Sequence, residues 1–307
     1  MTLEQLRIYV AVAEREHVTQ AAQALNLAQS AASGAIAALE ARHGTRLFHR
    51  VGRRIELTEA GRVFLTDAKA VLARAEAAEL TLSEFGALKR GTLAVHASQT
   101  IASYWLPRHL VAFRRAVPGI DIRLGVGNTA EVARTVREGA AELGFVEGLV
   151  DDETLSTVTV ARDQLELVVG PDHEWAVIDR IDYADLLQSE WVMREPGSGT
   201  RSEFEAALEN SGISPENLKV VLELPSNEAV RAAVEAGMGA AVLSASVVAS
   251  SLEVGLLHRV HLDLPDRMFH VLRHRERQPS LVGEALLKII RGDGALALVR
   301  EESHERP

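Results

Sequence analysis

The chain has 307 residues, no cysteine and a formal net charge of -10. The lack of cysteine excludes disulfides, a thiolate nucleophile and cysteine-ligated metal centres, and it suits a reducing cytosol. A hydrophobic content of 47% over this length is ample for two or three packed units rather than one core. No apolar run reaches the roughly 18 residues that a membrane span needs, and the N-terminus lacks a basic-then-apolar leader. We therefore expect a cytoplasmic protein that is neither exported nor membrane-spanning.

The negative charge is unevenly distributed along the chain. Residues 1–90 hold 12 Lys and Arg against 10 Asp and Glu, whereas the remaining residues hold 21 against 33. An acidic surface is repelled by nucleic acid, so only the N-terminal part is suited to bind it.

The N-terminal part begins with two predicted helices. Apolar residues recur at helical spacing over residues 3–16. Thr19 is a suitable N-cap for a second, short helix, which ends near Asn26, a residue that tolerates the left-handed backbone of a tight turn. The two segments therefore open a helix-turn-helix pattern.

A third helix is predicted to start almost at once, at Gln29 and Ser30. Its buried stripe comprises Ala32, Ile36 and Leu39. The residues of the opposite face are small and polar: Ser30, Ser33, Gly34 and Ala37. Such a face can approach a DNA major groove closely, so we expect this segment to be a recognition helix.

Two short alternating segments flank a turn at Gly52, which predicts a β-hairpin. Residues 41–55 contain five arginines and no acidic residue. An arginine-rich hairpin is either a solvated surface or a wing that lies on the phosphate backbone of DNA. Because it follows a helix-turn-helix pattern, we favour a wing in which Arg50, Arg53 and Arg54 contact the DNA backbone or minor groove.

This stretch resembles the N-terminal signature of LysR-type transcriptional regulators. The residues that carry the resemblance are Gln29, Ser30, Ala31, Ala32, Ser33, Ile36, Leu39, Glu40, Gly44, Leu47, Phe48, Arg50, Leu57, Thr58, Ala60 and Gly61. The chain departs from the family at Gly34 and Ala35, where a basic residue and a glutamine are frequent. Fewer long side chains remain to read bases, so more of the specificity is expected from Gln29, Ser30, Ser33, the wing and DNA shape.

The resemblance implies a domain order. It consists of an N-terminal all-α winged helix-turn-helix (residues 1–58), a long linker helix (59–89) and a two-lobed α/β effector-binding domain (90–301) of the type 2 periplasmic-binding-protein-like fold. Lobe I would comprise about 90–162 and 266–301, and lobe II about 163–265. The implied partners are double-stranded DNA with an interrupted palindrome, a small-molecule effector, RNA polymerase and further copies of the chain, as a homodimer and then a homotetramer.

No proline interrupts the predicted linker helix from Thr58 to Lys89. Its apolar residues recur at alternating spacings of four and three: Phe64, Ala68, Val71, Ala75, Ala78, Leu82 and Phe85. The stripe is explained either by packing on the helix's own domain or by dimerisation, which the resemblance favours. A dimer would present two recognition helices to a palindrome.

Beyond Gly91, predicted strands alternate with helices, which indicates α/β architecture with largely parallel sheets. The strands are predicted at 92–97, 120–126, 143–147, 165–169, 191–194, 220–224, 240–243 and 268–273. We place the two crossings between lobes near Arg162 and near Pro265.

Small polar residues follow four of these strands. They are Ser98, Gln99 and Thr100; Asn128 and Thr129; Gly197, Ser198, Gly199, Thr200 and Arg201; and Ser226 and Asn227. Ligands of open α/β sheets bind beyond the carboxyl ends of strands, where helix N-termini present free N–H groups, so these clusters could line one cleft. Each cluster alone is also explained by simple helix capping.

The third cluster goes further than capping. Its glycines allow close approach of a ligand, its hydroxyls can donate, and Arg201 adds a cation, so it resembles an anion-holding loop of some LysR-type effector domains. We expect a small oxyanion, or a carboxylate- or phosphate-bearing metabolite, because donors outnumber acceptors. Glu147 has three open interpretations: it orients Arg201 or a second donor, meets an amine of the effector, or lies in solvent. Glu195 raises the same question.

The remaining motifs are weak. The histidines are scattered, and neither a P-loop nor an arrangement typical of a nucleophilic site occurs, so we expect no catalytic residue, no metal and no cofactor. We expect a transcriptional regulator that binds a palindromic operator through Thr19, Gln29, Ser30, Ser33 and the wing. Two alternatives are a two-lobed small-molecule-binding module without a DNA role, which would not bind duplex DNA, and an enzyme on the same scaffold, which would turn its ligand over.

Overall fold

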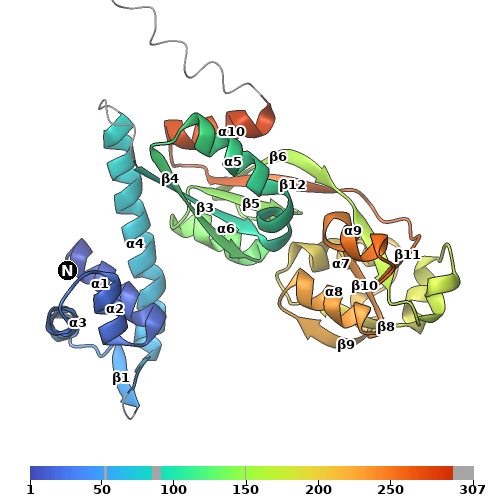
Figure 1. The fold of residues 1–307 in the computed structure, drawn as a ribbon, viewed down its shortest axis with the longest axis horizontal. Coiled ribbons are helices and arrows are strands. Elements are labelled where there is room, and N and C mark those ends of the chain that lie inside the picture. The colour runs from blue at the N-terminus through green and yellow to red at the C-terminus, as the bar shows by residue number, and fades with distance from the viewer. Residues whose placement is uncertain (52–53, 85–90, 149, 293–307) are drawn as a thin grey trace, which may run out of the picture. The chain divides into compact units, whose positions relative to one another are not determined.

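The computed structural model describes residues 1–51, 54–84, 91–148 and 150–292. It divides into an N-terminal unit, chiefly Met1–Gly86, and a C-terminal unit that holds nearly all of the remainder (Figure 1). None of the described helices combines the length and apolar character that a membrane span requires.

The N-terminal unit contains the predicted helices and hairpin. Its elements are α1 (Leu3–Arg15), α2 (Val18–Ala24), α3 (Gln29–His43), β1 (Phe48–Val51), β2 (Arg54–Leu57) and α4 (Glu59–Glu84). Asn26 takes the left-handed backbone that the turn requires, with φ 55°. The predicted cap at Thr19 is wrong: the ring of His17 accepts the hydrogen bond of the Gln20 amide, and Thr19 is an exposed residue inside α2. The capping acceptor is an imidazole nitrogen and not the threonine hydroxyl that we predicted.

The core of this unit lies between α1, α2, α3 and the first half of α4. Ala32, Ile36 and Leu39 are buried, which confirms the predicted stripe of α3. The hydroxyl of Tyr9 donates a hydrogen bond of 2.5 Å to the carbonyl oxygen of Gly61, which joins α1 to α4. Burial raises the pKa of Tyr9 to about 12.

The predicted apolar stripe of the linker helix is divided between two environments. Phe64 and Ala68 pack on the core of the N-terminal unit, as a helix bound to its own domain would do. Val71 is 42% exposed, and Ala78 is exposed as well. Phe85 and the side chain of Leu82 lie outside the described residues.

The C-terminal unit contains two five-stranded sheets, with the strand orders β4-β3-β5-β12-β6 and β11-β7-β10-β8-β9. We call the sheets with their helices lobe I and lobe II. The strands are β3 (Gly91–Ser98), β4 (Ile120–Gly127), β5 (Leu143–Glu147), β6 (Leu155–Asp163), β7 (Leu165–Val169), β8 (Glu190–Arg194), β9 (Lys219–Leu224), β10 (Ala240–Ser244), β11 (His258–Val260) and β12 (Arg267–His274). All eight predicted strands are present.

Helices connect these strands. Lobe I has the π-helical turn η1 (Ile101–Trp105), α5 (Leu106–Ala116), α6 (Thr129–Glu138) and α10 (Leu281–Arg291). Lobe II has η2 (Glu174–Val177), η3 (Tyr183–Gln188), α7 (Gly199–Asn210), η4 (Pro215–Asn217), α8 (Asn227–Glu235) and α9 (Ala245–Glu253). Phe145 is buried in lobe I, and in lobe II the rings of Trp191 and Phe204 pack with centroids 5.0 Å apart and planes tilted by 38°.

The prediction of largely parallel sheets is wrong. β3 pairs in parallel with β4 and β5, but β12 is antiparallel to both β5 and β6, and β7 is antiparallel to β10 and β11. The antiparallel pairs arise where the chain passes between lobes and returns. The missed strands are the short β11 and the threonine-containing edge strand β6.

A buried ion pair lies where the chain passes between the lobes. β6 ends at Asp163 in one sheet, β7 begins at Leu165 in the other, and β12 returns from Arg267. Nε of Arg267 donates to Oδ2 of Asp163 at 2.6 Å, and Ser244 donates to the other carboxylate oxygen at 2.9 Å. The pair therefore fastens the two passing segments to each other and to the end of β10.

Candidate functional site

The predicted recognition face lies at the start of α3. Gln29 and Ser30 are exposed, Ser33 is half-buried, and Nε2 of Gln29 lies 3.4 Å from the hydroxyl of Ser33. The N-cap of α3 is Ala28, which makes no side-chain capping bond, so the amides of Gln29 and Ser30 can meet a phosphate. A methyl group added at Gly34 would meet no atom within 4 Å, so the face is open there.

The wing is fastened to α3 by Glu40, whose role we had not assigned. Oε1 of Glu40 accepts hydrogen bonds from the amides of Leu47 at 2.8 Å and Phe48 at 3.1 Å. Oε2 accepts from Arg46 at 3.0 Å. The predicted DNA contacts of Arg50, Arg53 and Arg54 depend on side chains that lie outside the described residues.

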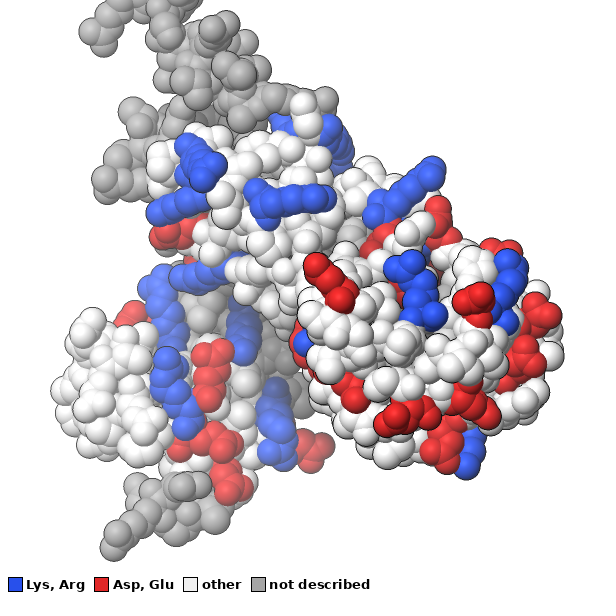
Figure 2. Space-filling view, turned by 45° about the vertical axis from the view of Figure 1, so that its right-hand side comes forward, with Lys and Arg blue, Asp and Glu red and all other residues white. Residues whose placement is uncertain are grey.

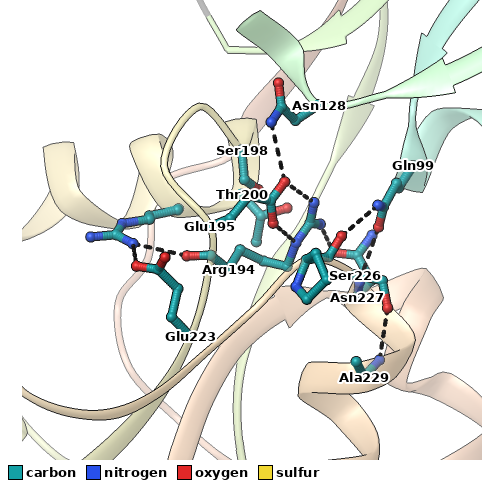
Figure 3. Close-up of polar contacts among 12 residues, drawn as sticks. Gln99, Asn128, Arg194, Glu195, Ser198, Thr200, Glu223, Ser226, Asn227 and Ala229 are labelled. Carbon is teal, nitrogen blue, oxygen red and sulfur yellow. Dashed lines mark hydrogen bonds and ion pairs between the residues drawn. The ribbon is translucent and has the colours of Figure 1, made fainter. Parts of the chain in front are cut away.

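The second candidate site lies between the lobes of the C-terminal unit, and Asn227 is its centre (Figure 3). The Asn227 amide nitrogen donates to Gln99 at 3.1 Å, and its side-chain Nδ2 donates to the hydroxyl of Thr100 at 3.0 Å. Gln99 also donates to the carbonyl of Pro225 at 2.8 Å. Ser226 caps α8 by accepting from the amide of Ala229. Residues from two predicted clusters, 127 residues apart, thus form one polar network.

Arg194 continues this network into lobe II. Its guanidinium is only 4% exposed and donates to Oδ1 of Asn227 at 2.5 Å and to both carboxylate oxygens of Glu195, at 2.8 and 2.9 Å. Glu195 in turn accepts from Asn128 at 3.3 Å, and Asn128 also caps α6. Burial acts to raise the pKa of Glu195, but the hydrogen bonds and charge of Arg194 outweigh it and hold the pKa below its usual value. The carboxylate is therefore ionised at neutral pH.

A third group of contacts joins the start of α7 to lobe I. The hydroxyl of Thr129 donates to the carbonyl of Glu147 at 3.3 Å, and Thr200 accepts from Arg267 at 3.0 Å. Glu147 is 2% exposed. Burial raises the pKa of nearby Glu203, an effect that Arg267 opposes and Glu147 reinforces. Of the three interpretations of Glu147, the one in solvent is wrong, because the packing of the lobes covers the side chain.

The glycines of the predicted loop are needed for this close approach. Gly197 has φ +87°, and its carbonyl accepts from the amide of Ala130 in lobe I at 3.3 Å. A methyl group at Gly199 would lie 2.6 Å from the hydroxyl of Thr129 and 2.8 Å from the carbonyl of Glu147. Ser198, the N-cap of α7, is buried and makes no side-chain capping bond. Only glycine at 199 lets the lobes meet here without a shift of backbone.

Arg201 takes a different position from the one that we expected. Its guanidinium donates to Glu205 at 2.7 Å, to Glu223 at 2.6 Å and to the carbonyl of Arg194 at 3.0 Å. The cations that enter the interlobe network are Arg194 and Arg267, neither of which we had selected. In the sequence, Arg194 is marked only as the last residue of an apolar strand and Arg267 only as the first residue of another.

Ser98 is the unsatisfied member of the network. It ends β3 next to Gln99 and Thr100, is 2% exposed, and its hydroxyl has no hydrogen-bond partner among the described residues. A separate cavity of about 10 Å³, room for one water molecule, lies within lobe II, where Arg194, Thr200 and Arg201 line it together with four apolar side chains. Within the described ranges, no group of three or more His, Asp or Glu side chains could hold a metal ion. The polar groups that the interlobe network offers are hydroxyls, amides and arginines.

Comparison with known proteins identifies both domains. Residues 3–62 match the model of bacterial regulatory helix-turn-helix proteins of the lysR family, and residues 86–295 match that of the LysR substrate binding domain. A protein of Cyanidioschyzon merolae named "Probable RuBisCO transcriptional regulator" is 35% identical over 265 residues, which cover 85% of this chain and 88% of that one. A namesake from Nostoc sp. is 33% identical over 85% of this chain and 79% of its own length.

Solved structures share the fold. Full-length CbnR complexed with its target DNA is 23% identical, with a TM-score of 0.70 over 96% of this chain and 100% of that chain. The Synechocystis PCC6803 CcmR regulatory domain in complex with 2-PG is 26% identical, with a TM-score of 0.60 over 66% of this chain and 96% of that one. The relatives are named transcriptional regulators, which confirms the expectation of a regulator rather than an enzyme. The chain, with its DNA-binding helix-turn-helix and its effector-binding domain, belongs to the LysR family of transcriptional regulators.

Proposed function

We propose that the chain is a cytoplasmic bacterial regulator that binds an interrupted palindromic operator, and that a small anionic metabolite bound between its lobes controls this binding. The observation that carries the ligand part is the buried hydroxyl of Ser98, which has no hydrogen-bond partner among the residues that the structure describes, although Gln99 and Thr100 beside it bond across to lobe II. A buried polar group without a partner costs stability unless something binds it.

Three features favour an anion. The buried guanidinium of Arg194 lies in the network, and the α7 N-terminus offers backbone amides because Ser198 makes no side-chain cap. The hydroxyl of Thr100 accepts from Asn227 and keeps its own proton free to donate. The regulatory domain of CcmR, which is 26% identical, was solved with 2-PG, so we expect a small acid of comparable size here.

Several observations support DNA binding by the N-terminal unit. The start of α3 offers free amides and exposed polar side chains, with Gln29, Ser30, Ser33 and, at the neighbouring helix, Thr19 as the proposed contacts. Residues 164–265 hold 17 Asp and Glu against six Lys and Arg. Figure 2 shows acidic side chains spread over the face of lobe II, which a DNA phosphate backbone would repel.

We infer that the chain acts as a homodimer through α4, and that dimers pair into a tetramer. The exposed Val71 and Ala78 continue the stripe begun by Phe64 and Ala68, and they are available to a second copy of α4. A change in lobe closure would re-space two recognition helices, with a coupling free energy of about 1–3 kcal/mol. RNA polymerase is the further partner that a regulator of this class implies.

Ser98→Ala tests the effector site with little damage to the free protein. Because the Ser98 hydroxyl makes no hydrogen bond with the described residues, the variant should unfold at or above the wild-type temperature in plain buffer. A ligand at 100 times its dissociation constant should raise the unfolding free energy of the wild type by about 2.7 kcal/mol. With 2-PG and inorganic phosphate as probes, Ser98→Ala should respond less, whereas Arg201→Ala, whose guanidinium is paired outside the network, should respond like the wild type.

If no small acid stabilises the wild type, or if Ser98→Ala responds fully, the proposed site is wrong. The DNA part is tested separately by anisotropy on duplexes at several salt concentrations. The double variant Arg53→Ala, Arg54→Ala should weaken binding to every sequence and flatten its salt dependence, whereas Ser33→Ala should weaken mainly the cognate site. An unchanged salt slope in the double variant would refute the wing contact.

A further inference from the structure

The cations around the interlobe network already have carboxylate partners. Arg267 is paired with Asp163 and Arg201 with Glu205 and Glu223. Arg194 is paired with its own neighbour, Glu195. An incoming anion therefore meets no free guanidinium among these three, and it must either bind to neutral donors or replace one of the carboxylates.

The three pairs differ in how replaceable the carboxylate is. Asp163 is 7% exposed, accepts a hydrogen bond from Ser244 as well, and joins the two segments by which the chain crosses between the lobes. Glu223 lies at an exposed position on β9, away from lobe I. Glu195, like Asp163, accepts hydrogen bonds from both lobes, from Arg194 in lobe II and from Asn128 in lobe I, but its side chain is 22% exposed. It is the carboxylate that an anion between the lobes would meet.

The donors that converge on Glu195 are the ones that bind oxyanions. Nε and Nη2 of Arg194 form the planar fork that matches a carboxylate or phosphate, and Nδ2 of Asn128 approaches from the opposite lobe (Figure 3). The remaining Arg194 nitrogen is held by Asn227, which fixes the direction of the fork. The side chain of Glu195 thus occupies an anion site built from both lobes.

We propose that Glu195 is an internal competitor for the effector, which the acidic group of the effector displaces from Arg194 and Asn128. This inference rests on the proposed effector site. Displacement breaks the hydrogen bond from Asn128 in lobe I to Glu195 in lobe II and replaces it with one from Asn128 to the ligand. Binding of the effector therefore changes the contacts that hold the two lobes together. The Glu195 carboxylate also sets a minimum affinity, because an anion must bind Arg194 and Asn128 more tightly than this attached carboxylate does.

This minimum affinity favours effectors that carry more negative charge. An incoming monoanion replaces one negative charge at the guanidinium with another and gains little Coulombic attraction. A phosphate-type group, with nearly two charges and three acceptor oxygens, gains over the carboxylate that it displaces. Glu195 is therefore a specificity-determining residue that disfavours simple carboxylates.

The test is calorimetric titration of the full-length protein with inorganic phosphate, at an ionic strength held constant with chloride. Glu195→Gln keeps the shape of the side chain and removes its charge, so phosphate should bind about tenfold tighter or more than to the wild type. Glu223→Gln is the matched control, since it removes the same charge from the partner of the neighbouring arginine. The affinity of Glu223→Gln for phosphate should stay within about twofold of the wild-type affinity.

Glu195→Asp provides a variant that keeps the charge and shortens the reach, and it should bind phosphate more tightly than the wild type but less tightly than Glu195→Gln. If the wild type binds phosphate and neither Glu195 variant binds it more tightly, the competitor role is refuted and the effector site stands. Equal gains in Glu195→Gln and Glu223→Gln also refute it, since the effect is then general electrostatics. If phosphate binds to none of the proteins, the anion site itself is absent.

Discussion

Replacing Glu40 should detach the wing from α3. The side chain is 9% exposed and its Oε1 accepts from the amides of Leu47 and Phe48, at the point where the chain enters β1. Glu40→Ala leaves both amides without their acceptor, and a buried donor left unsatisfied costs roughly 1–3 kcal/mol. Because the Phe48 amide is only partly buried, we expect a total loss of roughly 2–5 kcal/mol from the N-terminal unit.

Two matched variants separate the contributions. Glu40→Gln keeps an oxygen where Oε1 accepts both amides, and neutral hydrogen bonds are about half as strong as charge-assisted ones, so it should lose less than Glu40→Ala. Arg46→Ala removes only an ion pair whose arginine is 83% exposed, which should cost less than about 1 kcal/mol.

The assay combines denaturant unfolding of the full-length protein with hydrogen exchange at the amides of Leu47 and Phe48. In Glu40→Ala both amides should lose protection, and DNA affinity should fall together with its salt dependence because the wing is displaced. Wild-type stability with both amides still protected would refute the reasoning, since the wing would then be held by other contacts.

Three further variants have defined outcomes. Tyr9→Phe leaves the carbonyl of Gly61 without its donor and should cost about 1–2 kcal/mol in thermal unfolding, and the wild-type phenol should not ionise in absorbance titrations until about pH 12. Gly34→Ala fills open space in a helix interior and should add about 0.5–1 kcal/mol; a loss would show that the helix is strained there. Because the pKa of Glu203 is raised in the fold, its ionised form is disfavoured, so Glu203→Gln should be the more stable protein at pH 7. That gain should vanish in unfolding measured below the ordinary pKa of 4.5, and a constant gain would contradict it.

The recognition helix could be predicted because its determinants are local. The stripe of Ala32, Ile36 and Leu39 and the left-handed turn at Asn26 depend on spacings within one or two helical turns. The cap of α2 could not, because an imidazole of His17 replaces the usual hydroxyl or carboxylate. Local rules therefore predicted the positions of the helices but not the use of a histidine ring as the N-cap acceptor.

The charges of the interlobe network show a different limit. Arg201 follows a glycine-serine loop and has the attributes of an anion ligand, yet Glu205 lies one helical turn later and Glu223 on the adjoining strand, and both pair with it. The pairing of Arg201 with Glu205 could be predicted from their i, i+4 spacing. Arg194 could not be selected, because its burial depends on Asn227, 33 residues away, and on the closing of one lobe against the other.

The position of β12 also determines the order in which the C-terminal unit is completed during translation. β12 lies between β5 and β6, but residues 267–274 leave the ribosome after every strand of lobe II, which spans residues 165–260. Lobe II can close its sheet while lobe I still presents two unpaired inner edges, and such edges are prone to pair with other chains. A nascent or truncated chain that stops before Arg267 is therefore expected to aggregate through lobe I, although it contains every residue of lobe II.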